Sequence, residues 1–418
     1  MAQTGPALDR EVPVLLVKVG RYPQSHSAVG AVRSIGQLGV PVHAMVEDRL
    51  TPTAVSRYLT GAFVRPTTGR ESPERLLATV AAVGRAIGRR SVAVPTDDEA
   101  AVLLAEHAEE LSPYFLLPPV PPELPRRLAN KGEMKGICRA NGVSTPRACA
   151  PRNREELVAT ARSWGYPLVL KNLEAFTRLL HPAVCATTVV HDERELLASC
   201  PPDGQLSVLV QEYLPPQHAE DWITHLSCGP GGEPLAVFTG LKLRSWPPGA
   251  GVTTRACSLA NPELAGLATR LCRQIGYSGT ADLDWRLDLR DGRYNLVDFN
   301  PRVGAQFRLF ETVDGVDVLR ALHLSLTGRV VPQGPQLPRS FGVGQLDLQS
   351  IMATARREHR LPRDIRPHRE TERAWICGDD LVPAAVEALR FGATEALRLA
   401  RAVRANPVVR ALRSRPRD

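Results

Sequence analysis

Short apolar runs alternate with helical segments along the first part of the chain, and this alternation limits the fold more than any other feature. Apolar runs at 12–20, 40–48 and 91–96 predict buried strands, and the segments at 25–39 and 72–88 predict helices. Strands that alternate with helices usually form a parallel sheet with helices on its faces. We therefore expect a Rossmann-like α/β domain at the N-terminal end.

A proline-rich stretch marks where this pattern stops. Residues 116–125 read LLPPVPPELP, and proline there excludes both a helix interior and a central strand. We place the first domain boundary in this stretch, so that residues 1–124 form the first domain. In the next part, 125–331, helices accompany strands that turn antiparallel between 222 and 300, which is typical of an α+β fold.

The C-terminal extension, residues 332–418, contains a predicted amphipathic helix. Arg398, Arg401 and Arg404 recur at a spacing that puts them on one face of it. A basic face of this kind is usually a solvated surface over a packed apolar stripe. Such helices also bind membranes or acidic partners, and that alternative stays open.

Composition and charge exclude several classes of protein. Eight cysteines occur without a CxxC pair, which argues against a zinc site and against a disulfide framework. The net charge is +8, but the basic residues are not clustered with aromatics, so we expect no specific nucleic-acid binding. No apolar run is long enough for a membrane span or a signal segment, and we expect a cytoplasmic protein.

A β-hairpin is predicted at 279–300, and one of its strands ends in oxygen-bearing side chains. Side chains alternate along a strand, so Asp298 and Asn300 share a face. The pair Asp291 and Gly292 is a strong turn signal between the two strands. The length of the turn then decides which residue of the first strand faces Asp298.

Two turn lengths give two registers. A two-residue loop would put Asp284 on the opposite face from Asp298. A three-residue loop, 290–292 with Gly292 in the left-handed conformation, pairs Leu289 with Arg293 and sets Asp284 opposite Asp298. We expect the second register.

In that register Asp284, Asp298 and Asn300 form a cluster of hard oxygen ligands with two negative charges, which is costly without a cation. Mg²⁺ with a bound polyphosphate fits, because Mg²⁺ usually takes one or two carboxylates together with waters and phosphate oxygens. Arg302, two residues further on, could brace phosphate oxygens with its planar donors. The simpler alternative is a strand end at which Asn300 and Pro301 turn the chain.

The residues from about 125 to 331 resemble the ATP-grasp superfamily, in which an acid and an acidic strand ending in Asn-Pro-Arg hold Mg-ATP between two subdomains. The resemblance implies a lid subdomain with the hinge at 125–214 and a metal-binding subdomain at 215–331. Only five of the 52 basic residues are lysines, and two of them, Lys131 and Lys171, match the family's phosphate-binding lysines.

The hinge strand of the family matches VLVQEYL. There the resemblance implies that Glu212 and the backbone of Tyr213 and Leu214 meet the adenine edge, which offers a donor and an acceptor to the main chain. Glu220 would lie near the ribose hydroxyls. The same resemblance puts Asp284, Asp298 and Asn300 on metal positions and Arg302 beside the transferred phosphoryl group.

A finer resemblance is to the branch of ATP-dependent carboligases, or carboxylate-amine ligases, that includes D-aspartate ligase-like proteins. The stretch GLKLRSWPPGAGVTT carries it, and it implies that Lys242 and Arg244 face the carboxylate substrate or its acyl phosphate. As a simpler alternative, the two residues form an exposed cationic strand end.

Two departures from the family pattern bear on function. The loop at 172–188 lacks the glycines with which many relatives cover phosphates, so Thr177, Arg178 and His181 would have to cover them instead. Alternatively, the loop has lost that role. Most relatives have Glu at the position of Asp298. The Asp side chain is shorter, which could weaken the binding of a second metal ion.

The leading interpretation is an ATP-dependent carboxylate-amine ligase that acts on small-molecule carboxylate and amine substrates with ATP and Mg²⁺, or Mn²⁺ in its place. The resemblance implies that the carboxylate takes the γ-phosphoryl group and that an amine then displaces phosphate from the acyl phosphate. Two alternatives are an ATP-grasp phosphotransferase and a nucleotide-binding scaffold that has lost turnover. The oligomeric state stays open, a homodimer included.

Overall fold

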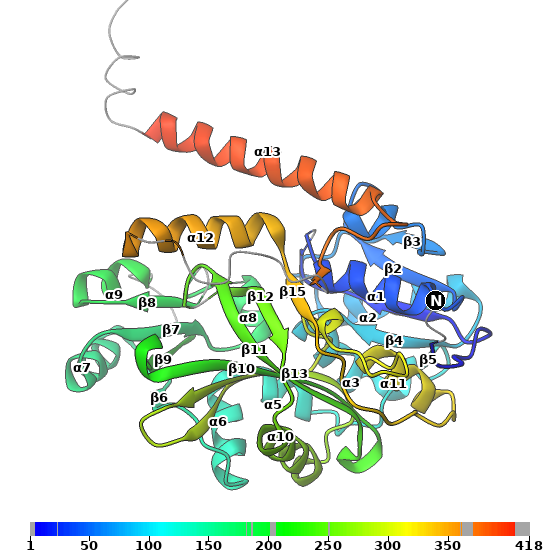
Figure 1. The fold of residues 1–418 in the computed structure, drawn as a ribbon, viewed down its shortest axis with the longest axis horizontal. Coiled ribbons are helices and arrows are strands. Elements are labelled where there is room, and N and C mark those ends of the chain that lie inside the picture. Colours follow the sequence, from blue (N-terminus) through cyan, green and yellow to red (C-terminus); the bar gives the residue numbers. More distant parts are fainter. Residues whose placement is uncertain are drawn as a thin grey trace, which may run out of the picture.

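The computed structural model describes residues 5–22, 24–180, 182–184, 187–200, 206–249, 251–359, 361 and 371–405. Its strands form three sheets. Figure 1 shows a five-stranded sheet on the right, a four-stranded sheet on the left and a seven-stranded sheet between them.

The five-stranded sheet is parallel and has the strand order β3-β2-β1-β4-β5. Both of its faces are covered, because Val14 and Leu16 of β1 enter one core and Leu15 and Val17 enter another. Burial on both sides explains why these strands are continuous apolar runs in the sequence. The elements of this region are β1 (Val14–Val17), α1 (His26–Gly36), β2 (Val42–Val46), β3 (Gly61–Val64), α2 (Pro73–Ile87), β4 (Ser91–Pro95), α3 (Asp98–Glu106), α4 (Ala108–Leu111) and β5 (Phe115–Leu116).

The four-stranded sheet is antiparallel and has the order β6-β9-β7-β8. Its own small core contains Leu157 of α7 and Leu196 of α9, which pack on Leu170 and Val210 of the strands. Its elements are β6 (Ala148–Cys149), α7 (Arg154–Trp164), β7 (Leu168–Asn172), α8 (Ala175–Leu180), β8 (Thr188–Val190), α9 (Glu193–Ser199) and β9 (Val208–Glu212).

The seven-stranded sheet has the order β14-β13-β10-β11-β12-β15-β16 and is antiparallel except where β15 meets β16. Two strands after residue 331 therefore extend the same sheet. Its strands are β10 (Ala219–Cys228), β11 (Pro234–Trp246), β12 (Val252–Ser258), β13 (Gly279–Asp288), β14 (Arg293–Asn300), β15 (Ser340–Gly342) and β16 (Thr371–Arg373), accompanied by helices α10 (Pro262–Ile275), α11 (Val318–Leu326) and α12 (Gly344–Glu358).

Two helices occupy the stretch after the proline-rich segment. Helix α5 (Leu124–Ala129) ends at Asn130, whose backbone is extended at φ −78° and ψ 113°, and α6 (Lys131–Ala140) begins directly after it. The Asn130 side chain accepts hydrogen bonds from the N–H groups of Gly132 and Glu133. Asparagine is a strong N-cap, and here the cap starts a new helix with Lys131 as its first residue.

The predicted hairpin is present, with Gly292 at φ 71° and Asp284 opposite Asp298. The predicted pairing of Leu289 with Arg293 is wrong, because Asp288 pairs with Arg293 across a four-residue loop. A β-bulge in β14, between the partners of Asp284 and Trp285, restores the expected register at the metal end. The longer loop is held by the Gly292 N–H, which donates to the Asp288 carbonyl at 2.8 Å.

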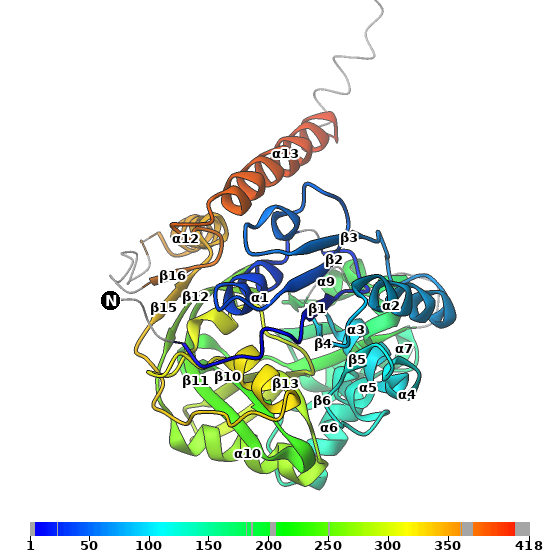
Figure 2. The same ribbon diagram turned by 90° about the vertical axis from the view of Figure 1, so that its right-hand side faces the viewer.

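The C-terminal helix α13 (Val382–Ala405) lies beside α12 and then extends away from the body (Figures 1 and 2). Arg390 ties its first half to Asp48, with Nη1 3.0 Å from Oδ1. Leu389 and Leu397 are 74% and 60% exposed, so the apolar stripe is not packed at these positions. The side chains of Arg401 and Arg404 lie outside the described residues. Of the helices described, none is both long and apolar enough to cross a membrane.

Candidate active site

A cavity of about 910 Å³ lies where the three sheets meet. The five-stranded sheet contributes residues just after the carboxyl end of β4, where ligands commonly bind in parallel sheets. The other two sheets contribute the ends of β7, β9, β11 and β14 and the middle of β13. Ten of the twelve residues assigned to the site from the sequence line it: Lys131, Lys171, Glu212, Tyr213, Leu214, Lys242, Asp284, Asp298, Asn300 and Arg302.

Two lysines approach the end of β14 from the opposite side of the cavity. Lys131, at the start of α6, forms an ion pair with Asp298. Burial alone would raise the pKa of Asp298, but Lys131 and Lys171 lower it below its usual value. Lys171 Nζ donates to the Val297 carbonyl at 3.1 Å, at the bulge of β14.

Lys171 is 7% exposed, and this burial lowers the pKa of its ammonium group to about 8, against the opposing effect of Asp298. Within the part of the chain that the structure describes, its hydrogen-bond partner is a neutral carbonyl oxygen. The site therefore holds a cation that is poorly compensated by hydrogen bonds, which favours an anionic ligand.

On the neighbouring strands Lys242 of β11 lies close to Asp284 of β13, with Nζ 3.1 Å from Oδ1. Burial raises the pKa of Asp284, although Lys242 partly opposes this shift. The pKa of Lys242 is itself raised, because Asp284 and Asp221 outweigh the lowering that burial causes. Asp284 thus favours the charged form of Lys242, whereas Lys242 only reduces the upward shift of the Asp284 pKa that burial causes.

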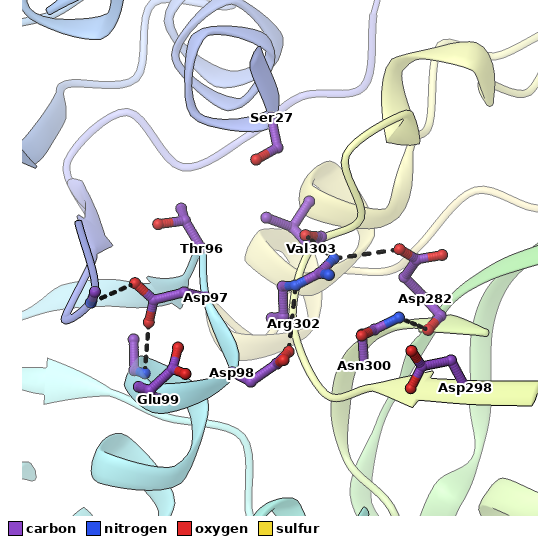
Figure 3. A network of polar contacts seen from close by, with 12 residues as sticks. Ser27, Thr96, Asp97, Asp98, Glu99, Asp282, Asp298, Asn300, Arg302 and Val303 are labelled. Atoms are coloured by element: carbon purple, nitrogen blue, oxygen red, sulfur yellow. Dashed lines mark hydrogen bonds and ion pairs between the residues drawn. The ribbon is translucent and has the colours of Figure 1, made fainter. Parts of the chain in front are cut away.

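Arg302 follows β14 through a tight turn in which its N–H donates to the Asn300 carbonyl at 2.8 Å. Its Nη1 donates to Asp282 Oδ2 at 3.2 Å, and its Nε lies 3.4 Å from Asp98 Oδ1 (Figure 3). Asn300 Nδ2 donates to the Asp282 main-chain carbonyl at 3.1 Å. The arginine is therefore held between the seven-stranded sheet and helix α3.

The donor set at this end of the cavity suits a hard divalent cation. Asp284 and Asp298 face each other across two strands, and Asn300 is on the same face one step further. Among the described residues no three His, Cys, Asp or Glu side chains form a site that could hold a metal. Mg²⁺ does not need one, since it takes one or two carboxylates and completes its shell with water and phosphate. In the structure Lys131 and Lys242 neutralise the two carboxylates.

The strand expected to meet adenine, β9, reaches the other end of the cavity. Glu212 Oε1 accepts a hydrogen bond from the Arg147 N–H at 2.6 Å, so part of this carboxylate is already used. The Leu214 carbonyl accepts from Arg286 Nη2 at 2.6 Å. Of the main-chain groups predicted to bind adenine, the Leu214 carbonyl thus already has a protein donor.

Glu220 does not line the cavity. Its Oε2 accepts a hydrogen bond from Trp222 Nε1 at 2.9 Å, and its neighbour Asp221 lines the cavity instead. Successive residues of a strand point to opposite faces, so an error of one position selects Glu220 in place of Asp221. Asp221 pairs with Arg286 at 2.8 Å.

Arg244 is also absent from the cavity lining. Its Nε and Nη2 bind the two carboxylate oxygens of Asp347 in α12, each at 2.8 Å. The strand pairing shifts between Lys242 and Arg244, so the alternation that would place both on one face is interrupted. The structure brings Lys242 to the site and uses Arg244 to fasten α12 to β11.

The fold and the sequence were compared with those of known proteins. No model of a known protein family matches the sequence. A D-aspartate ligase of Enterococcus faecium is 22% identical over 336 residues, which cover 76% of this chain and 77% of that protein. The crystal structure of an L-amino acid ligase from Bacillus licheniformis aligns with a TM-score of 0.56 at 19% identity, over 76% of this chain and 75% of that one.

A third similar structure is the biotin carboxylase domain of the Hydrogenobacter thermophilus 2-oxoglutarate carboxylase. It was solved with MgADP, ADP and bicarbonate, and aligns with a TM-score of 0.54 at 16% identity over 77% of this chain and 71% of that one. The chain has the fold of this ligase and this carboxylase domain.

The glycine-poor loop between β7 and β8 contains helix α8. Thr177 and Arg178 were expected to cover a triphosphate. Thr177 Oγ1 donates to Glu174 at 2.9 Å, and Arg178 binds both oxygens of Glu99 in α3, with Nε and Nη2 at 2.9 and 3.1 Å. His181 lies outside the described residues. Arg178 lines the cavity, but its guanidinium is held by the five-stranded region.

Two carboxylates of this site were missed in the sequence. Asp282 lies two residues before Asp284 and so on the same face of β13, a signal that the alternation rule could have supplied. Asp98 is the second of the two. Its position after β4, at the carboxyl end of a parallel strand, was the overlooked signal.

Proposed function

We propose that the protein is an ATP-dependent carboxylate-amine ligase that forms an amide through an acyl phosphate. The observation that carries the proposal is the pair of opposed walls in the cavity. Asp284, Asp298 and Arg302 at the end of the central sheet face Lys131 and Lys171 on the other side. The similarity to a D-aspartate ligase and to an L-amino acid ligase supports this reaction class.

ATP and Mg²⁺ are the nucleotide and metal of the proposed reaction, in line with the MgADP found in the biotin carboxylase domain. Asp284, Asp298 and Asn300 would hold Mg²⁺, which neutralises phosphate charge when bound. Lys131 and Lys171 bind phosphate oxygens as compact point charges. The hinge strand β9 binds the adenine edge.

For the chemistry itself, the chain supplies position and charge. Arg302 is held at two edges by carboxylates, so its guanidinium is oriented before the γ-phosphoryl group arrives. Lys242 faces the substrate carboxylate and then the acyl phosphate from the same side as Asp284. The amine then attacks the acyl carbon, phosphate leaves, and the nitrogen loses a proton to give the amide. No nucleophilic side chain is needed.

The domain assignment follows from this function. We assign residues 1–124 to a Rossmann-like domain that precedes the ATP-grasp fold, 125–214 to the lid and hinge, and 215–331 to the metal-binding part. Residues 332–418 form an extension whose strands β15 and β16 add to the central sheet.

A trapping experiment tests the proposed function. The protein is incubated with MgATP, pools of carboxylic acids that include amino acids, and hydroxylamine, which converts an acyl phosphate to a hydroxamate. We expect hydroxamate and ADP that depend on the acid, and a release of phosphate that depends on amine when hydroxylamine is replaced by amine pools. A phosphorylated product formed without any amine dependence would indicate a phosphotransferase, and nucleotide binding without turnover would indicate a scaffold.

The pKa of Lys171 predicts how nucleotide affinity depends on pH. In the free protein this pKa is lowered to about 8 by burial, with Asp298, Lys131, Asp284 and Lys242 around it. A bound phosphate raises the pKa again, so affinity is full below pH 8 and falls as the pH rises above that value. We expect the Kd for MgADP to rise about tenfold between pH 7.5 and 9.5. Titration calorimetry in two buffers should also show proton uptake near pH 8.

Lys171→Arg is the matched control for this prediction. Arginine keeps its charge throughout the range, so the variant should bind MgADP with a Kd that changes less than about threefold over the same pH interval. An unchanged pH dependence in this variant would contradict the assignment to Lys171.

A further inference from the structure

Three adjacent acids stand at the start of helix α3, where it enters the cavity. Asp97 is the N-cap, and its carboxylate accepts the N–H groups of Ala100, Val19 and Gly20 at 2.7, 2.9 and 3.0 Å. Its oxygens are therefore used by the backbone of the five-stranded region. A role in stabilising the loop after β1 accounts for Asp97 fully.

The next acid, Asp98, has no such backbone partners. It is 3% exposed, and its two oxygens each meet an arginine from a different part of the chain. Oδ1 lies 3.4 Å from Nε of Arg302, after β14, and Oδ2 lies 3.3 Å from Nη2 of Arg178, in α8. Figure 3 shows the first of these contacts, with the Asp98 carboxylate pointing at the Arg302 side chain.

The third acid, Glu99, is fully buried and binds Arg178 alone, through both oxygens. Arg178 therefore keeps a two-point partner even without Asp98. In contrast, Arg302 has Asp98 at one edge of its guanidinium and Asp282 at another, where Nη1 donates to Oδ2 at 3.2 Å. Removing Asp98 leaves Arg302 with partners at Nη1 alone, the Asp282 carboxylate and the Val303 carbonyl at 3.0 Å. Contacts at a single nitrogen do not fix the plane of the guanidinium.

Asp282 is a rigid partner for this purpose. It lies on a central strand and its Oδ1 is 3.1 Å from Nε2 of His225, a fully buried residue. A Cβ atom on Gly304 would lie 2.7 Å from Cγ of Asp282, so the backbone after Arg302 packs directly on the Asp282 carboxylate. Asp282 anchors one edge of Arg302, and the plane of the guanidinium then depends on the group at the other edge.

We propose that Asp98 is a positioning residue that holds Arg302 from the N-terminal part of the chain and fixes the plane of its guanidinium in the cavity. Only the expected kinetic effect rests on the proposed function, which assigns Arg302 to the transferred phosphoryl group. It means that helix α3, outside the two sheets that form the nucleotide cleft, completes the catalytic centre.

Asp98→Asn tests this, with Glu99→Gln as the matched control on the next residue of the same helix. Acid-dependent hydroxamate formation is measured at saturating MgATP. We expect Asp98→Asn to lower kcat about 10- to 100-fold, with the Kd for MgADP changed less than about threefold, since a small misplacement of a catalytic group has effects of this size. Glu99→Gln is expected to keep kcat within about threefold, because its partner is Arg178 and not Arg302.

An activity comparison in the Arg302→Lys background separates positioning from general damage. If Asp98 acts through the Arg302 guanidinium, Asp98→Asn should lower kcat there by less than about threefold. An equal fold loss in both backgrounds, or a kcat of Asp98→Asn within twofold of the wild type, would overturn the proposal.

A readout that needs no turnover distinguishes this inference from the proposed function. The Nε–H signal of Arg302 in a ¹⁵N spectrum is identified by its loss in Arg302→Lys. We expect its exchange with water to accelerate at least about tenfold in Asp98→Asn and not in Glu99→Gln, because the Nε edge loses the carboxylate with which it forms an ion pair. Unchanged exchange in Asp98→Asn refutes the positioning role. Accelerated exchange in Asp98→Asn, together with a wild-type protein that forms no acid-dependent hydroxamate, would support the positioning of Arg302 and refute the ligase.

Discussion

Asp298→Asn is expected to lower kcat/KM for ATP in acid-dependent hydroxamate formation by about a thousandfold. The substitution removes one of the two carboxylates that face each other at the end of the central sheet, while the shape of the side chain is kept. Lys131 then loses its ion-pair partner, and the divalent cation loses a charged ligand. Binding of metal-free ADP should change less than about threefold, because Lys131 and Lys171 remain.

Asp288→Asn on the neighbouring strand β13 is the control. Asp288 pairs with Arg290 at the turn of the hairpin, at the end remote from the cavity. We expect kcat/KM within about twofold of the wild type for this variant. If Asp298→Asn kept its activity, or if its metal-free ADP binding fell as steeply as its turnover, the metal assignment would be wrong.

The second large effect is expected from Arg302→Ala, which should lower kcat for hydroxamate formation by about 100- to 1000-fold. The guanidinium is held by Asp282 and Asp98 at the end of the cavity where Asp284 and Asp298 lie. Its loss removes one partner from each of the two acids that hold it. Added guanidinium ions should restore part of the activity, because both carboxylates that hold the group are still in place.

Arg290→Ala provides the comparison for this variant. Arg290 also pairs with an aspartate of the hairpin but is exposed at the turn, so activity should change less than about twofold and guanidinium should have no effect. Rescue that is equal in both variants would show that guanidinium acts elsewhere on the protein.

The metal end of the site could be predicted from local rules. Alternation along a strand puts Asp298 and Asn300 on one face, and a turn signal at Gly292 brings Asp284 opposite. The prediction was correct in register although the loop has four residues, because a bulge compensates for the extra one. The hydrophobic requirement of a buried strand face is stronger than the preference for a particular loop length.

Other assignments failed where local alternation is interrupted or a partner lies far along the chain. The shift in pairing after Lys242 turned Arg244 toward Asp347, about a hundred residues away. Glu220 was expected near the nucleotide, but its neighbour Asp221, on the other face of the strand, lines the cavity. Such bulges and registers depend on how neighbouring strands pack, which a single segment does not specify.

The sequence by itself determined the strand and helix pattern, the hairpin with its acids, and the two lysines that line the cavity beside it, because each depends on spacing within one segment. Only the tertiary structure decided that Asp98, some two hundred residues from Arg302, meets it across the cavity, and that Arg178 fastens α8 to α3. A charge buried in the interior needs its partner close by, and that partner can come from any part of the chain that folding brings there.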